Sequence, residues 1–356
     1  MNRRSASDLR PLARLMALVS VPTLALALLF VGCAQNGTSD GDIDPVVAQL
    51  FEPIPPEAPV PEDNPLTEAG IDLGHMLFFE QKLSRSGVIS CNTCHVVGAA
   101  GVDHLPRAVG EGGRIGPRRS PTVYNAAFLG SQFWDGRAAT LEEQAEGPIQ
   151  AHVEMDLTPD EAVERLRQTG YLPYFEAAFP DEEDPLTFEN ITKAIASFER
   201  TLITPGSPFD RYLEGETDAL TPEQAEGLDL FMSSGCAGCH NGVLLGGQGF
   251  ARFTHAEGGE DLGRAEVTGR EADEYVFRIA PLRNVAETGP YFHNGSAATL
   301  EEAVSVMGSA QLGRAFNEDE VQRIVAFLQS LTGEFPLVTY PQLPRVPQAY
   351  QPAPQN

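Results

Sequence analysis

Apolar residues recur at helical spacing over much of the chain. In residues 317–331, one face of a 3.6-residue period collects Val321, Ile324, Val325, Leu328 and Leu331. Residues 187–202 follow the same pattern. No sustained alternation of apolar and polar residues indicates a large sheet. The pattern therefore predicts a mostly α-helical protein with long loops.

Capping boxes mark where several helices begin. In this motif, Ser, Thr or Asn precedes Glu or Gln by three residues, and each side chain bonds the backbone of the other residue. The candidate pairs are Thr140/Glu143, Thr158/Glu161, Thr221/Gln224, Thr299/Glu302 and Asn317/Glu320. They predict helices that begin directly after residues 140, 158, 221, 299 and 317.

The chain also repeats itself. Residues 133–143 align with residues 292–302, and Asn125 aligns with Asn284 at the same spacing. Self-similarity of this kind is typical of tandem units. We therefore expect two related domains, at residues 65–212 and 213–335. A flexible linker at 34–64 is predicted to precede them, and a proline-rich tail at 336–356 to follow them over the surface.

The N-terminal residues have the pattern of an export signal. Residues 1–14 carry four arginines and one acid, and residues 15–32 are almost wholly apolar and end before Cys33. Three outcomes remain open: cleavage before Cys33 with a lipid attached to it, cleavage to a soluble protein, and retention as a membrane anchor. All three place the rest of the chain outside the cytoplasm, on the periplasmic side of a bacterial envelope.

The composition and net charge exclude some classes of binding partner. The 356 residues are 42% hydrophobic, which is enough for two cores. Lys and Arg number 24 against 50 Asp and Glu, so the net charge is −26. Nucleic acid is excluded as a partner because phosphate binding needs a basic surface. A basic partner protein would be attracted.

The strongest chemical signal is a Cys-x-x-Cys-His pattern that occurs twice. The residues are Cys91, Cys94 and His95 in the first copy, and Cys236, Cys239 and His240 in the second. Two thiols at this spacing attach one haem covalently, and the adjacent histidine binds its iron. A zinc site would need its ligands to converge, whereas these pairs lie in separate repeats. A redox dithiol would not need a histidine after the second cysteine of both pairs. We therefore predict two haem c groups, one in each domain.

The second iron ligand distinguishes the two sites. Met307 follows the repeated helix in the second copy and is predicted to be the second ligand of haem 2, while Pro148 occupies the equivalent position in the first copy. Haem 1 would then keep an open, reactive position. Near it, Gln144 could donate a hydrogen bond and Glu154 could shuttle a proton. Trp134, the only tryptophan, is either a core residue or a bridge for electrons between the haems.

At this point a family resemblance is evident. The chain resembles the bacterial di-haem cytochrome c peroxidases over residues 65–345. Apart from the two haem motifs, the resemblance rests on Leu77-Phe78-Phe79-Glu80, Ser120-Pro121-Thr122-Val123, Gln132-Phe133-Trp134-Asp135-Gly136-Arg137, Val153-Glu154-Met155, Tyr275-Val276-Phe277-Arg278, Leu282-Arg283-Asn284, Pro290-Tyr291-Phe292-His293 and Met307-Gly308-Ser309-Ala310-Gln311-Leu312-Gly313.

The resemblance implies an activity and roles for individual residues. Hydrogen peroxide would react at haem 1, and electrons from a small cytochrome c or a cupredoxin would enter at haem 2. Glu154 matches the family's acid/base, Gln144 its distal glutamine and Trp134 the tryptophan between the haems. A homodimer is expected by the same analogy. The sister family that matures a quinone cofactor carries tyrosine where Met307 stands, so the sequence favours the peroxidase.

Two positions depart from the resemblance. Many members have a histidine after the first haem motif that binds haem 1 in the oxidised protein, but here that position is Glu111, with His104 in the same loop. The family also holds a calcium ion through an asparagine side chain and two carbonyls. Thr288 and Pro290 match the carbonyls, but Arg119 replaces the asparagine, which argues against calcium because a guanidinium repels a cation.

Two other functions remain alternatives. A plain electron carrier would have two protein ligands on both irons and no substrate. An enzyme that oxidises a protein partner, as in the quinone-forming sister family, is the other; Met307 argues against it without excluding it.

Overall fold

The computed structural model describes residues 43–345. The predicted export signal and Cys33, and the end of the proline-rich tail, lie outside the described residues. All described residues belong to one unit of contacting chain. Among residues 43–345, no helix has both the length and the apolar character needed to cross a bilayer.

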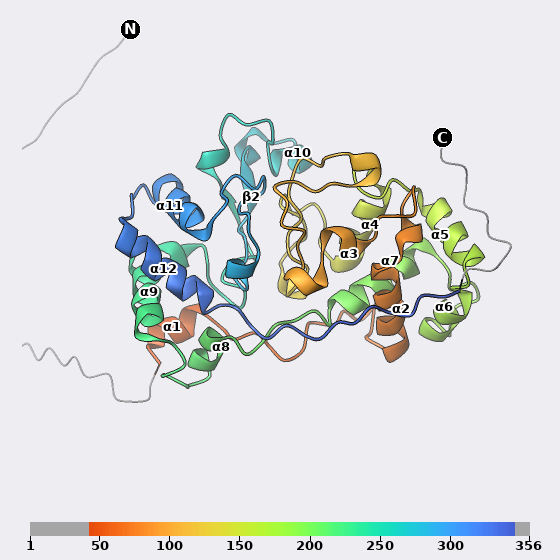
Figure 1. Cartoon of the computed structure of the whole chain (residues 1–356), viewed down its shortest axis with the longest axis horizontal. Helices are drawn as coiled ribbons and strands as arrows, with labels where there is room; N and C mark the ends of the chain where they lie inside the picture. Colours follow the sequence, from red (N-terminus) through yellow and green to blue (C-terminus); the bar gives the residue numbers. More distant parts are fainter. Residues whose placement is uncertain (1–42, 346–356) are drawn as a thin grey trace, which may run out of the picture. The chain divides into compact units, whose positions relative to one another are not determined.

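The described residues are mainly helical, as the hydrophobic pattern predicts (Figure 1). The α-helices are α1 (Pro45–Leu50), α2 (Glu68–Phe78), α3 (Cys91–Cys94), α4 (Leu141–Gln150), α5 (Pro159–Gln168), α6 (Leu172–Ala178), α7 (Phe188–Glu199), α8 (Pro208–Leu213), α9 (Pro222–Ser233), α10 (Ala265–Thr268), α11 (Leu300–Gln311) and α12 (Glu318–Gln329). Two short antiparallel strands, β1 (Phe250–Arg252) and β2 (Val276–Arg278), form a sheet.

The predicted helix starts are confirmed. Complete capping boxes form at the N-termini of α5, α9, α11 and α12. At α4 the Thr140 side chain accepts from the Glu143 N–H, but the Glu143 carboxylate accepts from Ala139 instead. That box is therefore half formed.

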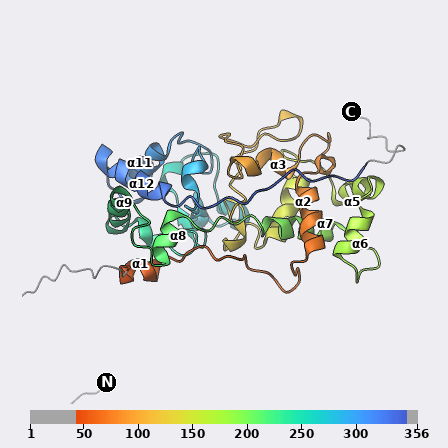
Figure 2. The same ribbon diagram turned by 60° about the horizontal axis from the view of Figure 1, so that its bottom comes forward.

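Two helix pairs have the same construction in the two halves of the chain. Helix α2 packs against α7, and α9 packs against α12 (Figures 1 and 2). Each pair crosses at a buried glycine. A Cβ on Gly74 would lie 1.8 Å from the Ala194 carbonyl oxygen, and one on Gly227 would lie 2.0 Å from the Arg323 carbonyl oxygen. The helices approach this closely because both residues lack a side chain.

We predict that Gly74→Ala destabilises the protein. Alanine is better than glycine in a helix interior by about 1 kcal/mol, so without the close contact the substitution would stabilise α2. Overpacking against the Ala194 carbonyl is expected to outweigh this and to lower the free energy of unfolding by about 1–3 kcal/mol. Denaturant unfolding of the holoprotein measures it.

The matched control is Gly98→Ala, because a Cβ there would meet no atom within 4 Å. Equal stabilities of the two variants would contradict the close-crossing explanation.

Apolar side chains gather in two main clusters. One surrounds α2 and α7 and includes Leu77 and Phe198. The other surrounds α9 and α12 and includes Phe231 and Phe327. These clusters are consistent with the expected pair of domains, whose boundaries remain a prediction.

The expectation of a flexible linker is wrong for the described residues 43–64. Residues 45–50 form α1, and Val47 and Phe51 are buried against the cluster around α12. The Ile54 N–H donates to the Asp210 carboxylate. The prolines suggested a tether, but the apolar side chains between them bury surface, which holds the segment in place.

The repeated segments have matching backbones and meet at one threonine. Asn125 and Asn284 are both left-handed, with φ of 61° and 60°. Both side-chain amides donate to the Thr204 hydroxyl oxygen, at 2.7 and 2.8 Å. The two copies are thus joined at Thr204 by equivalent hydrogen bonds.

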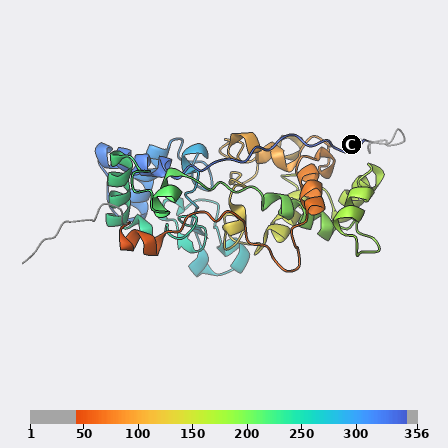
Figure 3. The ribbon, with the colours of Figure 1, turned by 90° about the horizontal axis from the view of Figure 1, so that it is seen from below.

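The described part of the C-terminal tail leaves α12 and reaches α2 (Figure 3). The His75 Nε2 lies 2.9 Å from the Thr339 carbonyl oxygen, and the Tyr340 ring packs edge-on against Phe79. The Asn92 amide, inside the first haem motif, donates to the Tyr340 hydroxyl. The tail therefore lies over the surface beside this motif.

Candidate haem sites and peroxide site

Each Cys-x-x-Cys-His motif forms a tight turn closed by the same backbone hydrogen bond. The His95 N–H donates to the Cys91 carbonyl at 2.9 Å, and the His240 N–H donates to the Cys236 carbonyl at 3.0 Å. None of the four motif cysteines forms a disulfide within the described residues. Each turn places two thiols and one imidazole together, as attachment of one haem requires.

Each motif histidine is oriented by a backbone carbonyl. The His95 Nδ1 lies 2.9 Å from the Pro121 oxygen, and the His240 Nδ1 lies 3.1 Å from the Leu245 oxygen. Burial lowers the pKa of both imidazoles. A neutral ring whose Nδ1 donates to a carbonyl presents the Nε2 lone pair to a metal. Both histidines therefore suit iron ligation.

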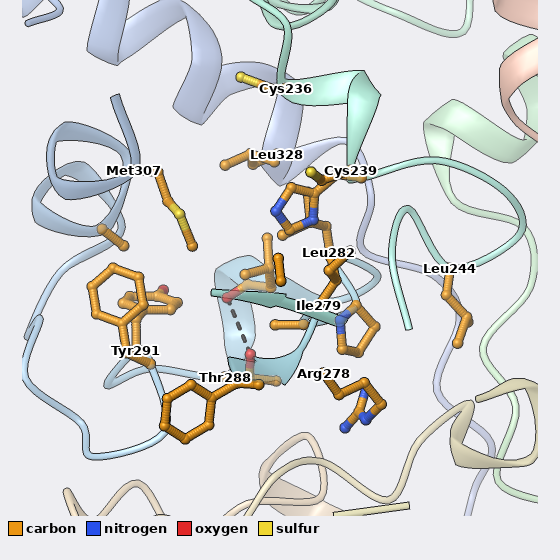
Figure 4. Close-up of a pocket in the computed structure, with 18 of the residues that line it drawn as sticks. Cys236, Cys239, Leu244, Arg278, Ile279, Leu282, Thr288, Tyr291, Met307 and Leu328 are labelled. Carbon is orange, nitrogen blue, oxygen red and sulfur yellow. Dashed lines mark hydrogen bonds between the residues drawn. The ribbon is translucent and has the colours of Figure 1, made fainter. Parts of the chain in front are cut away.

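The second motif opens on a large cavity of about 440 Å³. Cys236 and Cys239 lie on one side of it, and the Met307 side chain from α11 points in from the other (Figure 4). Its walls also include Pro121 and Trp134 from the first half of the chain. The cavity brings a cysteine pair, His240 and Met307 around one space.

Two buried arginines in this cavity have an unpaired donor. Arg119 Nε and Arg278 Nη1 have no hydrogen-bond partner within the described part of the chain. An unsatisfied buried donor costs about 1–3 kcal/mol. A haem carries two propionate carboxylates, which would pair with these donors, so the residues present fit the group. No role for Arg278 is predicted from the sequence, because its burial is evident only in the folded chain.

The equivalent helix of the first half, α4, offers no such ligand. Pro148 lies inside α4 at the position that Met307 occupies in α11. Because proline has no N–H, the Gln144 carbonyl lacks its helical donor. Among the described residues, the half-buried Gln144 side chain makes no hydrogen bond. Its amide is therefore available to a ligand.

Glu154 lies near the first cysteine pair. Its charge acts on the thiols of both Cys91 and Cys94. Burial raises the pKa of the Glu154 carboxyl, and Arg137 partly offsets this. The side chain of His152, two residues away, is 72% exposed and pairs with Asp156.

The loop before Glu154 is fixed to it. The Glu111 N–H donates to the Glu154 carbonyl at 2.7 Å. The buried Glu111 carboxylate accepts from the Ser86 N–H and hydroxyl, at 3.1 and 2.8 Å. His104 is exposed, and its Nδ1 lies 2.9 Å from the Gly289 oxygen in the second half of the chain. Both side chains therefore already have partners.

Trp134 lies where the two halves of the chain meet. Its indole N–H donates to the Arg119 carbonyl at 3.1 Å, and its own carbonyl accepts from the Arg278 N–H. Its ring packs edge-on against His293, the residue at the equivalent position of the second repeat. The tryptophan is half-buried and held by both halves.

Comparisons with known proteins show which family the chain belongs to. The family described as di-haem cytochrome c peroxidase matches residues 68–218. The cytochrome c551 peroxidase of Pseudomonas aeruginosa is 50% identical, over 83% of this chain and 88% of its own. The chain belongs to the di-haem cytochrome c peroxidase family. It is therefore an enzyme of the cytochrome c peroxidase type, as the resemblance implied.

Other relatives support this membership. The cytochrome c551 peroxidase of Nitrosomonas europaea is 44% identical over 90% of this chain and 95% of its own. The crystal structure of a MauG-like protein associated with microbial copper homeostasis is 31% identical, with a TM-score of 0.72, over 79% of this chain and 94% of its own. Membership in this peroxidase family implies haem c cofactors, hydrogen peroxide as substrate and a cytochrome as electron donor.

Proposed function

We propose that this peroxidase reduces hydrogen peroxide to water at the site of Cys91, Cys94 and His95. Electrons from a small cytochrome c or a cupredoxin would enter at the site of Cys236, Cys239, His240 and Met307. The observation that carries the proposal is the asymmetry between two equivalent helices. Helix α11 brings Met307 into the second site, whereas α4 has Pro148 at that position. The first site is therefore the one open to a substrate.

Glu154 is the proposed acid/base. When bound, the haem supplies an iron that coordinates peroxide and accepts its oxidising equivalents. The Glu154 carboxylate would take the proton from the inner peroxide oxygen and return it to the outer one, so that water leaves. Burial, which raises its pKa, suits a group that must both accept and release a proton near neutral pH.

Gln144 is proposed to position the peroxide. Its free amide can donate a hydrogen bond to the oxygen on which negative charge develops. Trp134 is proposed to carry electrons between the two sites, because it lines the cavity of the second site. Its indole N–H donates to Arg119 of the first half, and its carbonyl accepts from the Arg278 N–H of the second.

We further propose that the fully ferric enzyme reacts without prior reduction. Two contacts support this: the Glu111 carboxylate is bonded to Ser86, and the exposed His104 is held at the Gly289 carbonyl in the second half of the chain. On mixing ferric protein with hydrogen peroxide in a stopped-flow spectrometer, we expect an immediate change in the haem spectrum. Subsequent addition of reduced cytochrome c should restore the starting spectrum.

Two variants test the role of position 111. Glu111→Gln keeps an acceptor for Ser86 and should react as fast as the wild type. Glu111→His supplies an iron ligand in this loop and should react only after one-electron reduction. If the wild type reacts with peroxide only after prior reduction, the proposal that the ferric enzyme reacts directly is wrong. A protein that is inert in both states would instead support the electron-carrier alternative.

We propose that the enzyme acts on the periplasmic side of a bacterial envelope. The support is the pattern of residues 1–33, with basic residues, an apolar stretch and a cysteine for lipid attachment at Cys33. Mass spectrometry of the mature N-terminus would distinguish a lipidated Cys33 from a cleaved soluble form or a retained anchor. A homodimer is proposed by analogy alone, and sedimentation of the holoprotein tests it.

A further inference from the structure

The residues at the position expected for calcium do not fit a calcium ion. The Arg119 Nη2 donates to the Thr288 carbonyl oxygen at 2.6 Å. That oxygen is one of the two carbonyls expected to face the ion, and here it faces an N–H. Calcium prefers carboxylate, carbonyl and water oxygens. A guanidinium at this position supplies no lone pair and adds a positive charge.

Arg119 is buried and bonded to the second half of the chain through one guanidinium nitrogen and its backbone N–H. Its side chain is 6% exposed. Its N–H donates to the His293 carbonyl at 2.8 Å, and its carbonyl accepts from the Trp134 indole. Arg119 belongs to the first half of the chain, whereas Thr288 and His293 belong to the second. One residue thus joins the two halves through its backbone and its side chain.

Arg119 keeps its positive charge although it is buried. Burial lowers the pKa of Arg119 to about 10, and the charge of Asp103 favours the protonated form. A pKa of about 10 leaves the guanidinium protonated at neutral pH. The neighbouring Arg118 makes a bidentate ion pair with Asp261 of the second half, at 2.7 Å for both contacts. Positive side chains of the first half therefore meet carbonyl and carboxylate oxygens of the second.

We propose that the Arg119 guanidinium takes the place of the calcium ion and joins the two halves as a built-in cation. The enzyme then needs no calcium to keep its halves together. The backbone carbonyl of the same residue accepts from the Trp134 indole, so position 119 also contacts the tryptophan proposed to carry electrons. Metal content and thermal stability test this proposal, and neither depends on whether the peroxidase roles proposed above are correct.

The wild-type holoenzyme gives the first test. After extensive dialysis against EGTA, elemental analysis should find no stoichiometric calcium. The Tm should be the same in EGTA and in millimolar calcium chloride, since an ion that binds only the folded state would raise it by several degrees. One tightly held calcium per chain, or a Tm that falls in EGTA, would overturn the proposal.

Arg119→Asn gives the second test, because it removes the positive charge and supplies the amide oxygen that the resemblance expects. This variant should bind one calcium per chain and gain several degrees of Tm when calcium is added. The control is Arg270→Asn, since Arg270 pairs with Asp273 on the surface; it should show no calcium response.

The outcomes distinguish two claims: that Arg119 takes the place of the ion, and that the wild type needs no calcium. If Arg119→Asn folds but ignores calcium, the claim that the arginine takes the place of the ion fails. If Arg119→Asn does not fold, the metal content and Tm of the wild type decide by themselves.

Discussion

Glu154→Gln is expected to lower kcat/KM for hydrogen peroxide by about 10²–10⁴-fold, the range for loss of a general acid–base group. Glutamine keeps the size of the side chain but neither accepts nor returns a proton. The hydrogen bond from Glu111 to residue 154 is made to the backbone carbonyl, so the substitution leaves the loop in place. The effect should therefore be on chemistry rather than on folding.

The measurement is steady-state peroxidase turnover with reduced cytochrome c, together with the single-turnover reaction of the ferric protein. The matched control is Glu146→Gln, because Glu146 is an exposed residue of α4, the helix that precedes Glu154. It should retain wild-type kinetics. If Glu154→Gln keeps its peroxide reactivity within a few-fold of the wild type, Glu154 is not the acid/base.

The pH profile gives an independent readout for Glu154. The base must be ionised to take the proton, and burial raises the pKa of this carboxyl. The rate should therefore fall as the pH drops through a value above the ordinary glutamate pKa of about 4.3. This acid limb should disappear in Glu154→Gln, which a change in packing alone would not cause.

Met307→Leu is expected to give the second largest effect. Leucine conserves the volume and the apolar character of methionine, so the fold should tolerate it. It offers no sulfur to iron. A methionine/histidine pair raises the reduction potential of a haem. Its loss should lower the potential of the second haem by a sizeable part of the roughly 0.8 V that axial ligands span, and turnover with reduced cytochrome c should collapse.

A potentiometric titration followed by absorption measures the potentials of both haems. The control is Met232→Leu. Met232 is half-buried against the apolar cluster around α9 and α12 but does not line the cavity. Its potentials should match the wild type. If Met307→Leu changes neither potential nor turnover, another residue ligates the second iron. His293, which lines the same cavity, would then be the first to examine.

The helices were accessible to sequence reasoning because their signals are local. The two side chains of a capping box bond backbone groups only three residues away. Four of the five predicted boxes are complete. Local reasoning failed at residues 43–64. There Val47, Leu50 and Phe51 do stand at helical spacing after the Asp44-Pro45 helix start, but the prolines that follow favoured a tether. The segment is too short to show locally what these side chains are buried against, which is the distant cluster around α12.

By itself, the sequence determined the mostly helical fold, the two haem attachment motifs, the internal repeat and the family. These depend on residues within a few positions of one another, or on motifs that one covalent chemistry requires. Only the tertiary structure decided which side chains meet across the chain. Arg119 donates to Thr288, Glu111 accepts from Ser86, and His104 contacts Gly289. The physical reason is that a hydrogen bond or ion pair between distant residues depends on where the folded backbone places both groups, which no spacing along the chain records.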